Sequence, residues 1–364
     1  MDNIITYAES CLDTFEQKPF CDVDSLILSC LAYLDIPAQM AAGRTWRGMR
    51  LADLYRAEHF DRLFSVTFAP QKTRQLLTAL AASPRFRDIR VMGYTATLDA
   101  VREKQFSAMT FRLAPKLSYI AFRGTDSTVV GWKEDFNMAF RTPVPAQEAA
   151  RVYLTAAAIH CPGQILLGGH SKGGNLAVYA AAFCGARLQK RIGTVYSHDG
   201  PGFLPEVLSS AGYIGVVERI EKTLPQSSVV GMLLEQQEGY KIVKSKGVSL
   251  LQHDPFTWEI KDGAFLALEH LTVEARHLDR TLTAWLQKVD HAQRERLVDA
   301  LFGILESTDV RTLDQLRADW QKTIPAVARE AAKLDQDTRE LLFRALKELA
   351  ALSIKTLPAS LKKE

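Results

Sequence analysis

The sequence lacks an apolar run of about 18 residues, the length needed to cross a bilayer, so we expect no transmembrane helix. Its N-terminal segment carries acids early and has no basic stretch before an apolar core, so we expect no secretory signal. The chain has little net charge, +3 from 45 basic and 42 acidic side chains. That balance gives no electrostatic argument for nucleic-acid binding. These absences favour a globular protein of the cytoplasm.

Cysteine is also scarce. The 364 residues contain five cysteines, and no two of them have C-x-x-C spacing: Cys11, Cys21, Cys30, Cys161 and Cys184. An odd number without metal-ligand spacing supports neither a disulfide framework nor a zinc site. We therefore expect reduced thiols, in keeping with a cytoplasmic location.

The most informative segment is residues 165–178, which read ILLGGHSKGGNLAV. An apolar run stops at two glycines, the pattern G-x-S-x-G follows over residues 169–173, and an Ala-rich helical segment comes next. This order predicts a strand, a sharp turn and a helix, with Ser171 at the apex as a nucleophile. The glycines on either side suit a strained turn that other backbone approaches closely.

The rest of the first 262 residues alternates between helical and β-rich patterns. We predict helices within residues 1–60, one of them from Asp22, and over 73–82, 143–160, 175–183 and 203–222. We predict strands in residues 90–124, at 165–167 and 194–197, and one in 240–252. This alternation predicts an α/β domain with a largely parallel, doubly covered sheet, whose first two strands form an antiparallel edge hairpin.

Residues 263–364 differ in character, with Leu and Ala at helical spacing, abundant charge and few glycines. We predict about four amphipathic helices and no strands, with breaks near 288–291, 307–309 and 323–325 and a frayed tail at 361–364. The chain is thus divided into a domain over 1–262 and a C-terminal helical region over 263–364. That region packs on the core, forms a lid or provides an interaction surface.

A serine hydroxyl needs a base, an acid that orients the base, and N–H donors for the oxyanion. In folds that carry the serine on such a strand–turn–helix, the acid and then the histidine follow the serine along the chain. Of the later histidines, His253 ends an apolar run before an Asp-Pro loop, and we predict it as the base rather than a structural turn residue. His198 abuts Asp199 and would point away from it. The others are expected to be exposed helix residues: His270, His277 and His291.

Asp199 is the predicted acid because it follows a strand and precedes the tight Gly-Pro-Gly turn. The alternative is a turn or helix-cap aspartate. Competing acids are Glu218, Glu221 and Asp254, the last disfavoured because it adjoins His253. For the oxyanion, one donor is the N–H of Lys172. The second candidate donor is Thr125, in residues 121–127. An equally open alternative is that this segment is an ordinary turn in which Thr125 or Asp126 caps a helix.

Five motifs together resemble a known family. They are FRGTD, GWKEDFNM, GGHSKGGNLA, DGPGF and QHDPF, starting at Phe122, Gly131, Gly168, Asp199 and Gln252. The set is similar to class 3 lipases and closer to the bacterial Mbeg1-like family, over residues 20–260. The resemblance implies an α/β-hydrolase core with Ser171 as nucleophile, His253 as base and Thr125 in the oxyanion hole.

The chain departs from class 3 lipases at two lysines. Their acid usually lies in an Asp-x-Val-Pro stretch, whereas the nearest match here begins with Lys222. The lipase acid therefore cannot be carried over by position, and Asp199 remains the candidate. Lipases often have an apolar residue where this chain has Lys172. Its ammonium either pairs with Asp126, Glu134 or Asp135 and fixes the loop, or attracts an anionic substrate.

These observations predict a cytoplasmic serine hydrolase that cleaves an acyl ester or lipid-like substrate through Ser171, His253 and Asp199. Thr125 and Lys172 would stabilise the oxyanion, and no metal or organic cofactor is needed. We expect a small-molecule substrate, no nucleic-acid partner and a possible homodimer. The alternatives are a catalytically silent binding or scaffold protein and a thioesterase or acyltransferase that uses the same serine.

Overall fold

The computed structural model describes residues 2–41, 45–126, 128–247, 249–286, 288–307 and 329–356. Its centre is a nine-stranded mixed sheet with the order β1-β2-β3-β4-β5-β6-β7-β8-β11. The middle strands are parallel: β4 (Leu117–Phe122), β5 (Gln164–His170), β6 (Ile192–His198), β7 (Ile220–Pro225) and β8 (Tyr240–Val243). The flanking strands are antiparallel: β1 (Met49–Arg50), β2 (Arg90–Asp99), β3 (Lys104–Ala114) and β11 (Ala267–Leu268).

Apolar side chains of the central strands alternate between two cores, one on each face of the sheet. Along β4, Tyr119 and Ala121 enter one core, while Ile120 and Phe122 enter the other. Because successive strand residues point to opposite faces, a strand buried on both sides must be a continuous apolar run. That requirement explains why the sequence of β4 shows no polar alternation.

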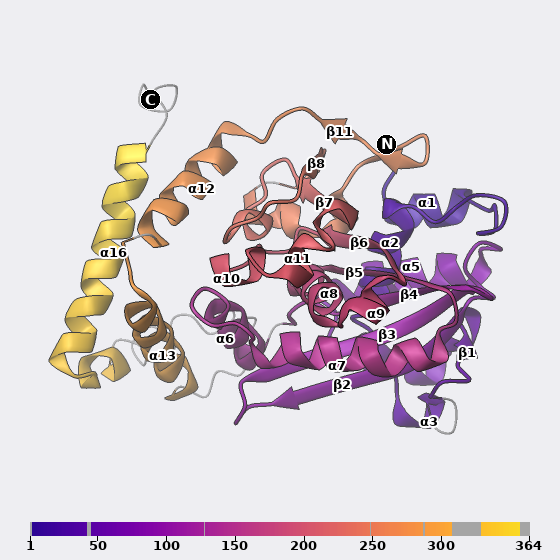
Figure 1. Ribbon diagram of the computed structural model, residues 1–364, viewed down its shortest axis with the longest axis horizontal. Coiled ribbons are helices and arrows are strands. Elements are labelled where there is room, and N and C mark those ends of the chain that lie inside the picture. The colour runs from indigo at the N-terminus through magenta and orange to yellow at the C-terminus, as the bar shows by residue number, and fades with distance from the viewer. Residues whose placement is uncertain are drawn as a thin grey trace.

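Helices cover both faces (Figure 1). One core includes residues from α1 (Ile4–Ser10), α2 (Asp22–Leu31) and α5 (Pro70–Ala82). The opposite core includes residues from α7 (Pro145–His160), α8 (Lys172–Phe183), α10 (Pro205–Leu208) and α11 (Ala211–Ile214). The predicted fold class is therefore confirmed: an α/β-hydrolase-like sheet, parallel at its centre, covered by helices and followed by a helical region.

Shorter elements connect these layers. The remaining helices before residue 262 are α3 (Ala38–Ala41), α4 (Phe60–Leu63), α6 (Val129–Asn137) and α9 (Ala186–Gln189). Single 3₁₀ turns are η1 (Leu51–Leu54), η2 (Ala57–His59), η3 (Val217–Arg219), η4 (Val230–Met232), η5 (Ser249–His253) and η6 (Pro255–Thr257). Two further strands, β9 (Ile260–Lys261) and β10 (Ala264–Phe265), form a separate two-stranded sheet, and Ile260 of β9 also makes an isolated bridge to Asp2.

The C-terminal region contributes α12 (Val273–Leu286), α13 (His291–Ser307) and α16 (Gln336–Thr356), which lie at one end of the sheet (Figure 1). α13 packs on α6, where the Phe302 ring lies 5.5 Å from that of Phe136. Beside this contact, Lys133 of α6 pairs with Asp299 at 3.3 Å. Within the described residues, no helix has the length and apolarity needed to span a membrane.

Several predicted elements are corrected by the structure. The helix predicted over 203–222 is three short helical turns, and its last residues begin strand β7. The prediction of no strands after 264 is wrong, because β10 and β11 lie there and β11 extends the sheet. Two-residue strands carry too few side chains to show a period of two. The division of the chain at 262–263 remains a proposal.

Other predictions agree more closely. β2 and β3 form the expected antiparallel hairpin, with β1 added outside it. The predicted break near 288–291 matches the gap between α12 and α13, whereas the predicted break at 307–309 falls where the described residues stop, at Ser307. The break at 323–325 and the tail at 361–364 lie outside the described residues.

Candidate active site

Ser171 occupies a sharp turn between β5 and α8. Its backbone is left-handed, with φ 59° and ψ −134°, which is costly for a residue other than glycine. A side chain at Gly169 would place its Cβ 2.2 Å from the carbonyl carbon of Gly173. One at Gly173 would place its Cβ 2.1 Å from the carbonyl oxygen of Phe122. The two glycines therefore permit the close packing that holds the serine at the apex.

His253 and Asp199, predicted from separate motifs, are in direct contact. The His253 Nδ1 lies 2.6 Å from Oδ2 of Asp199. The other carboxylate oxygen of Asp199, Oδ1, accepts hydrogen bonds from the Ser228 hydroxyl and, at 3.1 Å, from the Gly231 N–H. A carboxylate beside Nδ1 keeps the proton on that nitrogen and leaves Nε2 free to accept one. The Asp199 carboxylate is buried, whereas 28% of the His253 side chain is exposed.

Asp199 is placed by the end of β6, next to the strand that carries Ser171. Its N–H donates to the Thr223 carbonyl on β7 at 2.8 Å, and its backbone is also left-handed, with φ 51°. The Ser171 N–H donates to the carbonyl of His198 at 2.9 Å. The two neighbouring strand ends thus bring the serine and the aspartate to one edge of the sheet.

His170, the residue before the nucleophile, ties the histidine loop to the serine turn. Its Nε2–H donates to the His253 carbonyl at 2.8 Å, and its Nδ1 lies 3.3 Å from the Tyr33 hydroxyl. Burial, together with the nearby His253, holds the pKa of His170 well below its usual range, so the ring is neutral. Sequence reasoning did not assign this role, and its only signal was the position of His170 inside the G-x-S-x-G pattern.

The turn at Gly124 and Thr125 lies against the nucleophile. A Cβ on Gly124 would be 3.1 Å from Cβ of Ser171 and 2.6 Å from the carbonyl oxygen of His170. The hydroxyl of Thr125 donates to Asp135 on α6. Lys172 is the first residue of α8, where backbone N–H groups have no acceptor within the helix. Lys172 therefore follows Ser171 directly, and Thr125 follows the glycine that faces Ser171.

The ammonium of Lys172 is buried against the acidic residues of α6. Its Nζ lies 3.0 Å from Oε2 of Glu134 and 3.3 Å from Oδ1 of Asp135. Burial alone would lower the pKa of Lys172, but the two carboxylates outweigh it and the pKa is raised. The third predicted partner, Asp126, pairs with Arg123 instead, at 3.5 Å.

The competing residues have other surroundings. Asp254 pairs with Lys72 at 2.8 Å and caps the turn η6, so it shapes the histidine loop. His198 is buried, its Nε2 lies 2.9 Å from the Ser25 hydroxyl, and burial lowers its pKa to about 4. Glu218 and Glu221 are exposed on η3 and β7.

Lys222, which stands where the lipase resemblance would place an acid, is a buried cation. Its Nζ lies 3.7 Å from Oε1 of Glu238 and donates to Gln236. Burial lowers its pKa, and the nearby Glu238 and Asp199 oppose that shift. The position therefore supplies no carboxylate, and the carboxylate that contacts His253 is that of Asp199 on the neighbouring strand end.

Apolar side chains surround the histidine loop. The ring of Phe68, 44% exposed, lies 5.1 Å from Tyr33, 6.0 Å from His170 and 6.2 Å from Phe256. Leu251, two residues before His253, is 70% exposed. These two side chains therefore leave exposed apolar surface beside the loop that carries His253.

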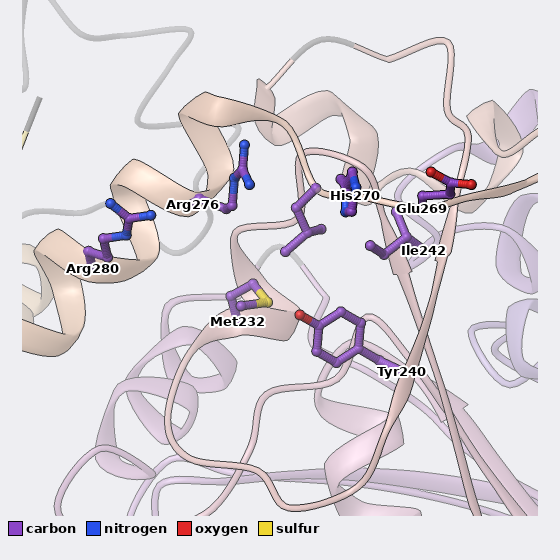
Figure 2. A pocket seen from close by; sticks show the side chains of 8 residues that line it. Met232, Tyr240, Ile242, Glu269, His270, Arg276 and Arg280 are labelled. Carbon is purple, nitrogen blue, oxygen red and sulfur yellow. The ribbon is translucent and has the colours of Figure 1, made fainter. Parts of the chain in front are cut away.

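A separate cavity of about 300 Å³ lies between α12 and β8 (Figure 2). Met232 and Tyr240 line one side, and Arg276 and Arg280 of α12 line another. Because Met232 follows Gly231, whose N–H binds Asp199, the cavity borders the loop that holds the acid. His270 also lines the cavity. It is exposed, as predicted, but it precedes α12 and is therefore not a helix residue. His277 lies in α12, and His291 is the first residue of α13.

Comparisons with known proteins agree with the predicted family. A family model described as Mbeg1-like matches residues 80–303. A solved fungal lipase–inhibitor complex is 16% identical over 67% of this chain and 79% of that one, with a TM-score of 0.38. The native Rhizomucor miehei lipase propeptide complex is 16% identical over 70% of this chain and 76% of that one, also with a TM-score of 0.38. No curated protein sequence matches the chain.

Proposed function

We propose that this chain, which belongs to the Mbeg1-like family, is a serine hydrolase that cleaves a carboxylic ester. The observation that carries the proposal is the 2.6 Å contact between His253 Nδ1 and Asp199, on a loop that His170 joins to the strand–helix turn of Ser171, where φ is 59°. A buried acid that orients a partly exposed histidine next to such a serine has the parts that activate a hydroxyl nucleophile.

In the proposed reaction, the Ser171 oxygen attacks the acyl carbonyl carbon while Nε2 of His253 takes the hydroxyl proton. Asp199 stabilises the imidazolium that forms. Collapse of the tetrahedral intermediate breaks the bond to the alkoxy oxygen, and His253 returns the proton to the leaving alcohol. Water then attacks the acyl-enzyme by the same route, releases the carboxylic acid and restores the serine. Every step uses groups of the chain and water alone.

We assign the oxyanion to the backbone N–H groups of Thr125 and Lys172. The Thr125 hydroxyl has one proton, and it donates that proton to Asp135. The hydroxyl therefore has nothing left to donate to a substrate oxygen while that bond is intact. N–H groups fixed on either side of the nucleophile are the usual way to stabilise charge that develops in the transition state.

The substrate we propose is an acyl ester or lipid-like molecule whose apolar chain rests against Phe68 and Leu251. The exposed fractions of these two side chains, 44% and 70%, leave apolar surface beside the base. Phe68 and Tyr33 come from a segment before residue 80, outside the family match. This surface would therefore tune the acyl preference of this chain. We further propose a cytoplasmic location, in keeping with its five unpaired cysteines.

A fluorophosphonate probe tests the function, because it reacts covalently only with an activated serine. We expect labelling at Ser171, located by mass spectrometry, and hydrolysis of p-nitrophenyl esters. Ser171→Ala should abolish labelling and lower turnover by about 10⁴–10⁶-fold. Folded wild-type protein that is neither labelled nor active on any ester would instead indicate a silent binding module. Turnover of thioesters but not of oxygen esters would indicate a thioesterase.

A further inference from the structure

A buried ionic cluster joins four elements beneath the proposed oxyanion site. Glu134 of α6 is fully buried and accepts three hydrogen bonds. The donors are the Gln105 N–H of β3 at 3.0 Å, the Ala146 N–H of α7 at 2.8 Å and the Lys172 ammonium of α8 at 3.0 Å. A carboxylate with three fixed donors is held in one position, so Glu134 is an anchor for the start of α8.

The neighbouring carboxylate, Asp135, continues the cluster to the Thr125 turn. One of its oxygens accepts the Thr125 hydroxyl. The other, Oδ1, has no hydrogen-bond partner among the described residues and lies 3.3 Å from the Lys172 ammonium. Burial raises the pKa of Asp135, and the attraction of Lys172 opposes that shift. Lys172 thus provides the positive charge that favours an ionised Asp135, the form that accepts from Thr125.

We propose that Lys172 is a positioning residue whose side chain locks both oxyanion donors together. This inference rests on the proposed function. The backbone N–H of Lys172 is one donor, and its ammonium reaches round to Asp135, which fixes the turn that carries the other donor, Thr125. One residue therefore sets the spacing of the two N–H groups before any substrate arrives.

The arrangement argues against recruitment of an anionic substrate by Lys172. Only 1% of its side chain is exposed, and its ammonium already donates to Glu134 and, at 3.4 Å, to the side-chain Oε1 of Gln105. Asp135 forms an ion pair with it at 3.3 Å, so three acceptor groups of the protein surround the ammonium. The positive charge of Lys172 therefore interacts with groups of the protein and is not accessible to an anionic group of a substrate.

Removal of the ammonium should affect turnover more than substrate binding. The cluster carries one positive and two negative charges, so its net charge is −1, and Lys172→Met changes it to −2. Without the ammonium, the buried carboxylate of Glu134 and the half-buried carboxylate of Asp135 repel each other, which loosens the hold of Asp135 on Thr125. Since loss of one oxyanion donor costs about 10²–10³-fold in kcat, we expect its misplacement to lower kcat by about 10–100-fold. KM should change by less than about threefold, because the donors act on charge that develops in the transition state.

The experiment compares wild type with Lys172→Met, Asp135→Asn and the double variant of both changes. Lys133→Met is the matched control, since Lys133 is also a buried lysine between two carboxylates, Glu103 and Asp299, but forms no ion pair with Glu134 or Asp135 among the described residues. The readouts are kcat and KM on a p-nitrophenyl ester and amide hydrogen exchange of residues 121–126. Asparagine can still accept from Thr125, and the double variant returns the cluster charge to −1. We therefore expect it to regain at least about fivefold in kcat over Lys172→Met, a rescue that a packing defect would not show.

Wild-type kcat in Lys172→Met, or a double variant no better than the single one, would overturn the proposal. If Lys172→Met does not fold, the comparison moves to the Asp135→Asn background. There the added Lys172→Met change should alter kcat by less than about threefold, and a larger loss would contradict a role through Asp135. If the wild-type protein has no activity, the hydrolase proposal fails, and hydrogen exchange alone then tests the positioning role of Lys172. Faster exchange of residues 121–126 in Lys172→Met but not in Lys133→Met supports the positioning role, and unchanged exchange overturns it.

Discussion

The exchange Asp199→Asn is the sharpest test of the proposed triad, because it changes one atom and leaves the surrounding packing intact. Asparagine is nearly the same size, and its oxygen can keep the bonds that Oδ1 accepts from Ser228 and Gly231. Its NH₂ group then faces Nδ1 of His253, where Oδ2 lies 2.6 Å away in the wild type. An NH₂ donor cannot face an N–H donor, so the ring must carry its proton on Nε2.

A histidine protonated on Nε2 cannot accept the proton of Ser171, so kcat should fall sharply. The loss of this orientation costs about 10⁴-fold in the triad taken as a worked example of serine catalysis. We expect about 10³–10⁴-fold here, or about 4–5.5 kcal/mol of transition-state stabilisation. Folding should be nearly unaffected, since only one of the three interactions of the carboxylate is lost.

The assay is steady-state hydrolysis of a p-nitrophenyl ester, with thermal unfolding measured in parallel. Asp254→Asn is the matched control, because Asp254 is the acid next to His253 but pairs with Lys72. It should retain activity within about tenfold, since surface ion pairs contribute little. Retention of more than a tenth of wild-type kcat by Asp199→Asn would refute the assignment. Loss of activity in Glu218→Gln or Glu221→Gln would then identify the acid.

Three further predictions follow from other contacts. Phe68→Ala should lower kcat/KM for an octanoyl ester about tenfold relative to an acetyl ester, because burial of such a side chain is worth about 1.5–3 kcal/mol. Equal losses on both esters would contradict the acyl surface. Arg85→Met should lower the free energy of unfolding by about 3–5 kcal/mol in urea titrations, since it leaves Asp24, a fully buried partner 2.9 Å away, without its cation. Arg87→Met, which removes an exposed pair, should cost less than about 1 kcal/mol. His198 should reduce stability in acid, because its pKa falls from 6.5 to about 4 on folding and the unfolded chain therefore binds more protons between these values. The free energy of unfolding should therefore fall as the pH drops below about 6.5, and this loss should reach about 3 kcal/mol near pH 4. A Tm-against-pH curve for His198→Gln that fell as steeply as wild type would contradict this account.

The sequence was sufficient to predict those functional candidates that stand in a recognisable local pattern of flanking residues. Ser171 stands between glycines after an apolar run, and Asp199 and His253 each close a strand or apolar run before a tight turn. Because strand ends gather at one edge of a parallel sheet, the contact between Asp199 and His253 could be expected without knowing its distance. The central strands β4 to β6 were also predictable, because each has a short run of apolar or β-branched residues that ends at a glycine-containing or polar turn.

The remaining features depend on contacts between distant residues. Lys172 meets Glu134 across 38 positions in the sequence, so residue type alone left Asp126 as an equal candidate. His170 meets His253 across 83 positions, and nothing local indicates that bond. The helix predicted over 203–222 runs into the first three residues of strand β7, and no strand is predicted there. The residues IEKTLP mix apolar and charged side chains, while the interior position of β7 in the sheet comes from its neighbours.

The left-handed backbones of Ser171 and Asp199 bear on how this protein responds to selection for heat tolerance. With φ of 59° and 51°, each residue holds a conformation that costs about 1–3 kcal/mol and that glycine adopts freely. Glycine at Ser171 would relieve that strain and remove the proposed nucleophile in the same step, whereas glycine at Asp199 would also remove the contacts of its carboxylate with Ser228, Gly231 and His253. A library screened for thermal survival alone would therefore enrich clones without the proposed nucleophile, and engineering for durability has to keep Ser171 fixed.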